Sequence, residues 1–146
     1  MLLIKDGKIL LVKRRDDLEM FPGWYILPGG KQEAHEMPPE TAIRETEEET
    51  GIKVSNPYLK IFATHFHEYK AKVFLVYIFV SSEFQGELRE SKEGAPVWLP
   101  IEQALQEPKL YPDLKRHLKL ILESADNQII FTYHRYNEKL EITEAR

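Results

Sequence analysis

Five glutamates crowd one short stretch of the sequence, between residues 40 and 49. If this stretch is helical, Glu45, Glu48 and Glu49 lie three and four residues apart and share one face. Like charges at this spacing repel each other and weaken a helix unless a cation lies between them. Mg²⁺ prefers carboxylate oxygens and completes its shell with waters and substrate phosphates. The pattern indicates a divalent-cation site, and a solvated charged helix face is the alternative.

Two neighbouring features favour the cation site. Arg44 is the only Lys or Arg between Glu33 and Gly51, so the cluster lacks the alternating opposite charges of an ordinary exposed helix. Arg44 also stands beside Glu45 and one turn from Glu48, where its fork of donors can orient carboxylates. A Pro-Gly-Gly turn at residues 28–30 precedes the cluster and can bring backbone close to a phosphate-bearing ligand.

The elements that must position these residues alternate between strands and helices. Two prolines favour a helix start at residue 38, and Gly51 suits the left-handed residue after its end. Strands are expected at residues 2–4, 9–12, 24–27, 58–66, 73–80, 95–99, 128–136 and 139–143, and further helices at 101–106 and 112–124. This interleaving predicts an α/β protein with a mixed sheet.

Composition narrows the classes of partner. The chain has 146 residues, a formal charge of −4 and no cysteine, which excludes disulfides, thiolate metal sites and a cysteine nucleophile. It lacks the basic excess of a nucleic-acid binder and any apolar run of about 18 residues. We therefore expect a cytoplasmic protein with a small partner, no nucleic-acid polymer and no membrane. A monomer and a homodimer remain open.

Two histidines, His65 and His67, alternate along a predicted strand and point to the same side. Such a pair can bind zinc, but no third ligand stands at a metal-binding spacing in the sequence. Hydrogen-bonded or surface histidines are therefore the favoured interpretation, with a contact to substrate as the minor one.

The acidic stretch resembles the signature of the Nudix hydrolases. Gly30, five residues, Glu36, seven residues, Arg44-Glu45, then Glu48-Glu49 and Gly51-Ile52 match every fixed position of that signature. The resemblance implies a Nudix-type α/β/α sandwich around a mixed sheet, formed by residues 1–146 as one domain. It further implies an enzyme that cleaves a nucleoside diphosphate linked to another group, using Mg²⁺ or alternatively Mn²⁺.

The resemblance also implies roles for individual residues. Glu45, Glu48 and Glu49 match the glutamates that hold the metal, and one of them can help to deprotonate the attacking water. Gly29 matches a residue whose carbonyl is a further metal ligand, and Arg44 matches the orienting arginine. The positions that match structural residues of the signature are Gly30, Glu36 and Gly51.

Other segments resemble the MutT-like branch, which hydrolyses oxidised purine nucleoside triphosphates. Glu93 matches an acidic loop near the metal or the water. Tyr111 and Asp113 match a segment that stacks on the base and reads its edge, and Arg14 matches a basic position near the substrate. The sequence of residues 24–30 is instead similar to that of broad-range members, so ADP-ribose or dinucleoside polyphosphates remain alternative substrates. A non-catalytic nucleotide sensor is the less favoured class.

Overall fold

The computed structural model describes all 146 residues, and its backbone groups into two compact units that alternate along the sequence. The first unit contains Met1–Tyr58 and Phe79–Tyr111, and the second contains Leu59–Ile78 and Pro112–Arg146. None of the helices combines the length and the apolar character that crossing a membrane would require. The expectation of a single domain stays a prediction.

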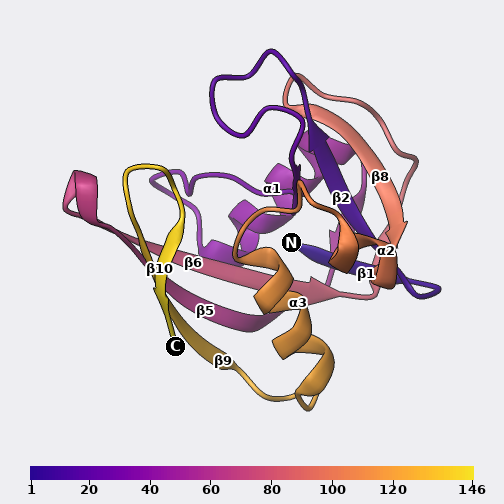
Figure 1. Ribbon diagram of the computed structural model, residues 1–146. Coiled ribbons are helices and arrows are strands. Elements are labelled where there is room, and N and C mark those ends of the chain that lie inside the picture. The colour runs from indigo at the N-terminus through magenta and orange to yellow at the C-terminus, as the bar shows by residue number, and fades with distance from the viewer. The chain divides into compact units, whose positions relative to one another are not determined.

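The first unit contains a mixed sheet built around its second strand. Its elements are β1 (Leu2–Lys5), β2 (Lys8–Arg14), β3 (Tyr25–Ile26), α1 (Pro38–Thr50), β4 (Lys53–Ser55), β7 (Glu83–Gln85), β8 (Gly94–Pro100) and α2 (Ile101–Gln106). Strand β2 pairs antiparallel with β1, β3 and, over its full length, β8 (Figure 1). Strand β1 pairs in parallel with the end of β6 (Lys72–Ser81), and β4 forms a separate pair with β7. The buried side chains of β1 and β2 form the core of this unit.

Helix α1 begins and ends where its sequence predicts. Its first residues are two prolines, and the Glu40 carboxylate accepts a hydrogen bond of 2.7 Å from the backbone N–H of Met37. This contact satisfies one of the N–H groups that a helix start leaves unpaired. At the other end Gly51 adopts the left-handed conformation with φ 79°, and its N–H donates to the Glu47 carbonyl. The helix therefore holds its glutamates in a fixed register.

The second unit contains a four-stranded mixed sheet and one amphipathic helix. Its elements are β5 (Tyr58–His67), the 3₁₀ turn η1 (Glu68–Lys70), most of β6, α3 (Leu114–Glu123), β9 (Ile130–Tyr136) and β10 (Ile142–Ala145). The strand order is β10-β9-β5-β6, with β5 and β9 parallel and β9 and β10 antiparallel. Helix α3 buries Leu114, His117, Leu118 and Ile121. These residues are spaced three and four apart and therefore lie on one face of the helix.

The expected α/β class is confirmed, and the expected long strands and helices are present. The final strand is the main error, because β10 begins at residue 142 rather than 139. The Asn137 side-chain oxygen accepts hydrogen bonds from the N–H groups of Lys139 and Glu141, which prolongs the turn. Strands β4 and β7 were not expected, since three residues each carry too little periodic signal.

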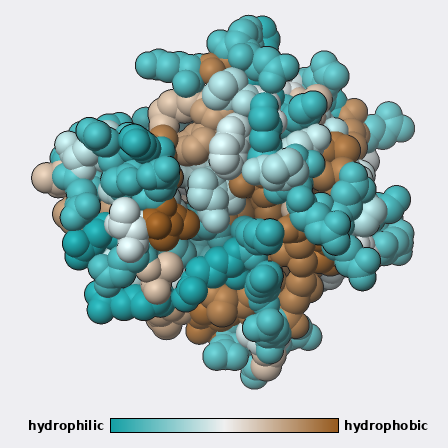
Figure 2. All heavy atoms as spheres, in the orientation of Figure 1, coloured by the Kyte–Doolittle hydropathy of each residue, from teal (hydrophilic) through white to brown (hydrophobic).

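Most of the face that Figure 2 shows is hydrophilic, with hydrophobic residues in separate patches between the polar ones. Several large apolar side chains of the second unit are nevertheless exposed, among them Val73, Leu75 and Phe131. Val73 and Leu75 flank the likewise exposed Phe74 in β6, so three consecutive apolar residues are exposed there. The oligomeric state stays a prediction.

Candidate active site

A cavity of about 400 Å³ lies within the first unit, where α1 meets the ends of β2 and the loops after β3 and before β8. Its lining combines four carboxylates, three basic side chains and the Gly-Gly turn. The lining residues are Arg14, Gly29, Gly30, Lys31, Glu45, Glu48, Glu49, Ser91, Lys92 and Glu93. The structure thus brings the predicted metal-binding residues together with two other predicted site residues, Arg14 and Glu93.

Glu49 is the most enclosed of the helix carboxylates, with only 6 % of the residue exposed. Its Oε2 accepts a hydrogen bond of 3.0 Å from the backbone N–H of Gly29. Burial raises the pKa of Glu49 to about 7, the nearby charges of Glu45 and Glu93 raise it further, and the Gly29 hydrogen bond opposes them. The site therefore holds crowded, poorly solvated negative charge that a divalent cation would stabilise.

The backbone of Gly30 closely approaches Glu45. A Cβ at this position would overlap the Glu45 carboxylate, so any side chain here would displace that carboxylate. This contact explains in physical terms why the turn requires glycine. Glu48, by contrast, has a 59 % exposed side chain at the cavity, and the same helix face thus carries both an enclosed and an open carboxylate. The donor set is hard oxygen, which fits Mg²⁺.

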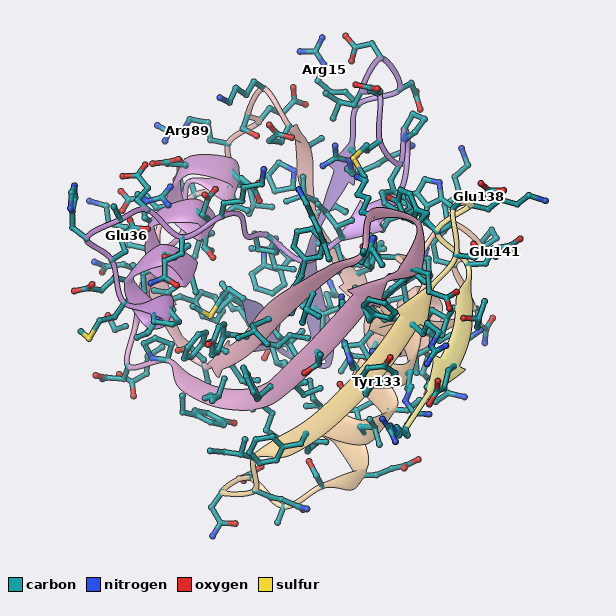
Figure 3. All side chains as sticks on the ribbon, turned by 90° about the vertical axis from the view of Figure 1, so that its left-hand side faces the viewer. Arg15, Glu36, Arg89, Tyr133, Glu138 and Glu141 are labelled. Atoms are coloured by element: carbon teal, nitrogen blue, oxygen red, sulfur yellow. The ribbon has the colours of Figure 1, made fainter.

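Arg44 links the loop before α1 to the glutamates on the helix. Its guanidinium donates to both oxygens of Glu36, at 2.5 and 3.0 Å, and its Nη1 lies 3.1 Å from Glu45 Oε1. Hydrogen bonds from Arg44, the Glu33 N–H and the Thr41 hydroxyl lower the pKa of Glu36 to about 2. Figure 3 shows Glu36 beside helix α1. Arg44 therefore holds Glu36 through a planar, two-pronged contact and reaches Glu45 with its third nitrogen.

Arg44→Lys should lower turnover about 10-fold or more while the protein stays folded. A lysine keeps the charge but loses the fork that joins Glu36 to Glu45, and lost orientation of a metal ligand typically costs 10- to 100-fold in activity or metal affinity. Steady-state hydrolysis at varied Mg²⁺ concentration, with circular dichroism as the folding control, measures this effect. Unchanged turnover at every Mg²⁺ concentration would contradict the orienting role.

Arg14 and Glu93 face each other across the antiparallel pair of β2 and β8. Arg14 Nη1 lies 3.5 Å from Glu93 Oε2, and Arg14 Nε donates to the Met20 carbonyl at 3.0 Å. Both side chains line the cavity. The pair thus places one positive and one negative side chain beside the helix glutamates. Lys31, Ser91 and Lys92 also line this cavity, and the sequence interpretation missed them because exposed loop residues have no distinguishing pattern.

Tyr111 and Asp113 occupy different surroundings. Tyr111 belongs to the first unit, is partly buried, and packs edge-on against Phe21 with ring centroids 4.9 Å apart. The Tyr111 N–H donates to the Tyr25 carbonyl, and the Tyr25 N–H donates to the Lys109 carbonyl. Asp113 belongs to the second unit, where it is 4 % exposed. Tyr111 is not among the residues that line the cavity.

A second group of polar side chains was missed by the sequence interpretation. His65, Asp113, His117 and His134, all of the second unit, bring one potential ligand atom each within 4.8 Å of one another. No third ligand for His65 stood at a metal-binding spacing in the sequence, because its ligand-type neighbours come from β9 and the start of α3, in distant parts of the chain. The spacing of Asp113 and His117, one helical turn apart, was the available signal.

Comparison with known protein families agrees with this geometry. The family model for the NUDIX domain matches residues 1–121. The chain belongs to the Nudix family. The matched residues include the whole acidic segment and all the residues that line the cavity.

Solved and curated Nudix proteins resemble the chain over different lengths. The crystal structure of a MutT protein from Bacillus halodurans superposes with a TM-score of 0.87 at 29 % identity, covering 99 % of this chain and 92 % of that one. The CTP pyrophosphohydrolase of Escherichia coli is 32 % identical over 75 % of this chain and 79 % of its own length. The uncharacterized Nudix hydrolase YvcI of Bacillus subtilis is 34 % identical over 64 % of this chain.

The activities for which these Nudix relatives are named differ. Besides the CTP enzyme, they include an ADP-ribose pyrophosphatase of Methanocaldococcus jannaschii, 34 % identical over 62 % of this chain, and an 8-oxo-dGTP diphosphatase of Proteus vulgaris, 33 % identical over 51 %. The chain spans 58 % of the length of YvcI and 52 % of the ADP-ribose enzyme. Membership in the family therefore identifies the class of enzyme and leaves the nucleotide to be proposed.

Proposed function

We propose that this Nudix hydrolase is a Mg²⁺-dependent nucleoside triphosphate diphosphatase that acts on an oxidised purine nucleotide such as 8-oxo-dGTP. The observation that supports this proposal is that three helix glutamates, the Gly-Gly turn and Arg14 line one cavity. Charged oxygens that repel each other in the free protein are suited to a cation and to the triphosphate that the cation accompanies.

The reaction we propose uses one water. Its oxygen attacks a phosphorus of the triphosphate in line with the anhydride bond, that bond breaks, and the products are the nucleoside monophosphate and pyrophosphate. A carboxylate of the cavity accepts the proton that the water loses. Bound Mg²⁺ would neutralise charge on the phosphate oxygens and acidify a bound water.

Most residues of the cavity have a role in this proposal. Glu45, Glu48 and Glu49 would hold the metal together with the Gly29 carbonyl, while Glu93 would contact the metal or the attacking water. Arg14 binds phosphate oxygens as a charged hydrogen-bond donor. Arg44, Glu36, Gly30 and Gly51 position these groups. Pre-organised charges in a partly enclosed site are the main source of rate enhancement in phosphoryl transfer.

Tyr111 is the proposed stacking platform for the base, since an aromatic ring can stack on any base. Each stacked base contributes about 1–3 kcal/mol to the binding free energy. The predicted role of Asp113 in reading the base edge has less support, because this carboxyl is buried and already accepts a hydrogen bond from Tyr136. Cytidine triphosphate enters the candidate substrates because the CTP pyrophosphohydrolase is among the relatives with the fullest coverage.

A hydrolysis panel tests the proposed substrate. Purified protein with Mg²⁺ is offered 8-oxo-dGTP, the ordinary dNTPs, CTP, ADP-ribose and diadenosine polyphosphates, and the nucleotide products of each are separated and quantified by chromatography. We expect the highest kcat/KM for 8-oxo-dGTP. A preference for ADP-ribose or the dinucleotides would keep the metal site and overturn the triphosphate assignment. Binding without hydrolysis of any compound would support a nucleotide sensor.

A further inference from the structure

The buried polar group of the second unit is assembled from three elements. His65 on β5 and His134 on β9 are direct partners in the parallel register of these strands. Asp113 immediately precedes α3, and His117 lies in its first turn, so both project from one side of the helix. The three imidazole rings have centroids between 5.0 and 6.3 Å apart, and His65 Nε2 lies 3.1 Å from Asp113 Oδ2.

This group is enclosed and incompletely hydrogen-bonded. His65, Asp113, His117 and His134 are exposed by 6, 4, 1 and 0 % respectively. Neither ring nitrogen of His134 has a hydrogen-bond partner, and His65 Nε2 approaches Asp113 without hydrogen-bond alignment. Buried polar atoms are almost always satisfied in native proteins, because each orphan destabilises the fold. A single cation at the centre would satisfy His65 Nε2 and one ring nitrogen of His134.

We propose that His65, Asp113, His117 and His134 bind a structural Zn²⁺ ion. Three imidazoles and one carboxylate form a four-coordinate set of the kind that zinc takes in closed sites. Tetrahedral bonds of about 2.0–2.2 Å would bring the ligand atoms to roughly 3.4 Å from each other. The observed separations of up to 4.8 Å need only small side-chain rotations to reach that geometry.

Two further residues support the proposed ligands from outside. Tyr136 donates a hydrogen bond from its hydroxyl to Asp113 Oδ2 at 2.9 Å, and His117 Nε2 lies 3.2 Å from the Thr132 hydroxyl. Hydrogen bonds of this type orient metal ligands and set the tautomer of a histidine. Burial lowers the pKa of His117 to about 3, so its ring is neutral at pH 7 and keeps a lone pair.

The proposed zinc site differs chemically from the glutamate site. Imidazole nitrogens favour zinc and related transition metals, whereas the carboxylates of α1 favour Mg²⁺. The ligand set is complete and buried, with no open position for substrate, as in structural rather than catalytic zinc sites. Zinc would therefore fasten the start of α3 to β5 and β9. Asp113 becomes a metal ligand in place of its predicted contact with the base.

Metal content and metal binding test this proposal on the untagged full chain. After EDTA treatment and dialysis, Zn²⁺ affinity is measured by competition with a chromogenic chelator, in excess Mg²⁺ that occupies the glutamate site. We expect one zinc per chain and a higher thermal midpoint with zinc. His134→Gln should weaken zinc binding at least about 100-fold, because losing a direct ligand exceeds the 10- to 100-fold cost of losing an outer partner. His35→Gln, an exposed loop histidine, is the matched control and should change nothing.

Cobalt substitution provides a measurement that does not require a variant to fold. Co²⁺ in the native protein should give the strong visible absorption of a tetrahedral nitrogen and oxygen site. A weak octahedral spectrum would overturn the proposal. So would zinc binding that Glu49→Gln abolishes and His134→Gln leaves unchanged, or a folded native protein that binds no zinc. In the last case the cluster would hold an ordered water instead.

Discussion

Glu49→Gln should reduce turnover by at least about 100-fold, the scale of losing one pre-organised electrostatic group. The substitution keeps the shape of the side chain and removes the negative charge that the proposed Mg²⁺ requires. Because burial raises the pKa of Glu49 to about 7, the charged form is unfavourable in the folded protein. The neutral glutamine should therefore leave the free energy of unfolding unchanged or raise it by about 1–3 kcal/mol at pH 8.

The combination of lost activity and retained stability distinguishes a catalytic role from a folding defect. Glu47→Gln is the matched control, because Glu47 lies on the same helix and forms only a surface ion pair with Lys53 at 3.5 Å. Steady-state kinetics and urea unfolding measured on both variants make the comparison. Full activity of Glu49→Gln, or a loss of activity that parallels a loss of stability, would remove Glu49 from the proposed metal site.

The metal-free protein should lose stability when the pH falls from 7 to 5. Burial lowers the pKa of His65 and His117 to about 3 from an ordinary 6.5. The unfolded chain therefore binds more protons in this window, and the free energy of unfolding decreases as the pH falls. Burial raises the pKa of Asp113 to about 6, which offsets part of the loss. His134, whose pKa burial lowers to about 4, adds to the loss, and Glu49, whose pKa burial raises to about 7, offsets a further part of it. We expect a net change on the order of 2 kcal/mol in the native protein.

Urea unfolding in EDTA at several pH values measures this dependence. The Glu49→Gln protein is the suitable background, since it removes a carboxyl whose raised pKa acts in the opposite direction. His117→Gln in that background should flatten the pH dependence, because it deletes one of the groups that bind protons only on unfolding. Equal slopes with and without His117 would show that the cluster does not control acid stability.

Helix α1 was the most predictable part of the fold because its information is local. Two prolines, a glutamate at the third position and a terminal glycine specify its ends, and the spacing of the glutamates follows from the helical repeat. The sequence could not separate Glu49 from Glu48, which share a face. Their difference in burial arises because the Gly29 turn, 20 residues earlier, contacts Glu49.

The buried histidine cluster was unpredictable for the opposite reason. His65 and His134 meet only through the register of two parallel strands, nearly 70 residues apart in sequence. The alternation of residues along one strand predicts which side chains share a face of the sheet. It does not predict which strand pairs with it. Asp113 had a plausible role in the sequence interpretation, and only its burial with these histidines suggests another.

The segment that carries Tyr111 is fixed by main-chain atoms. Its N–H donates to the Tyr25 carbonyl, while the Lys109 carbonyl accepts from the Tyr25 N–H. Neither bond involves the side chain at position 111, so these two bonds do not depend on which residue stands there. The position of this segment and the chemical nature of the side chain at residue 111 can therefore change independently. In the proposed role of Tyr111, a substitution at this position would change the side chain that meets the base without removing these two bonds, so one backbone could serve different nucleotides.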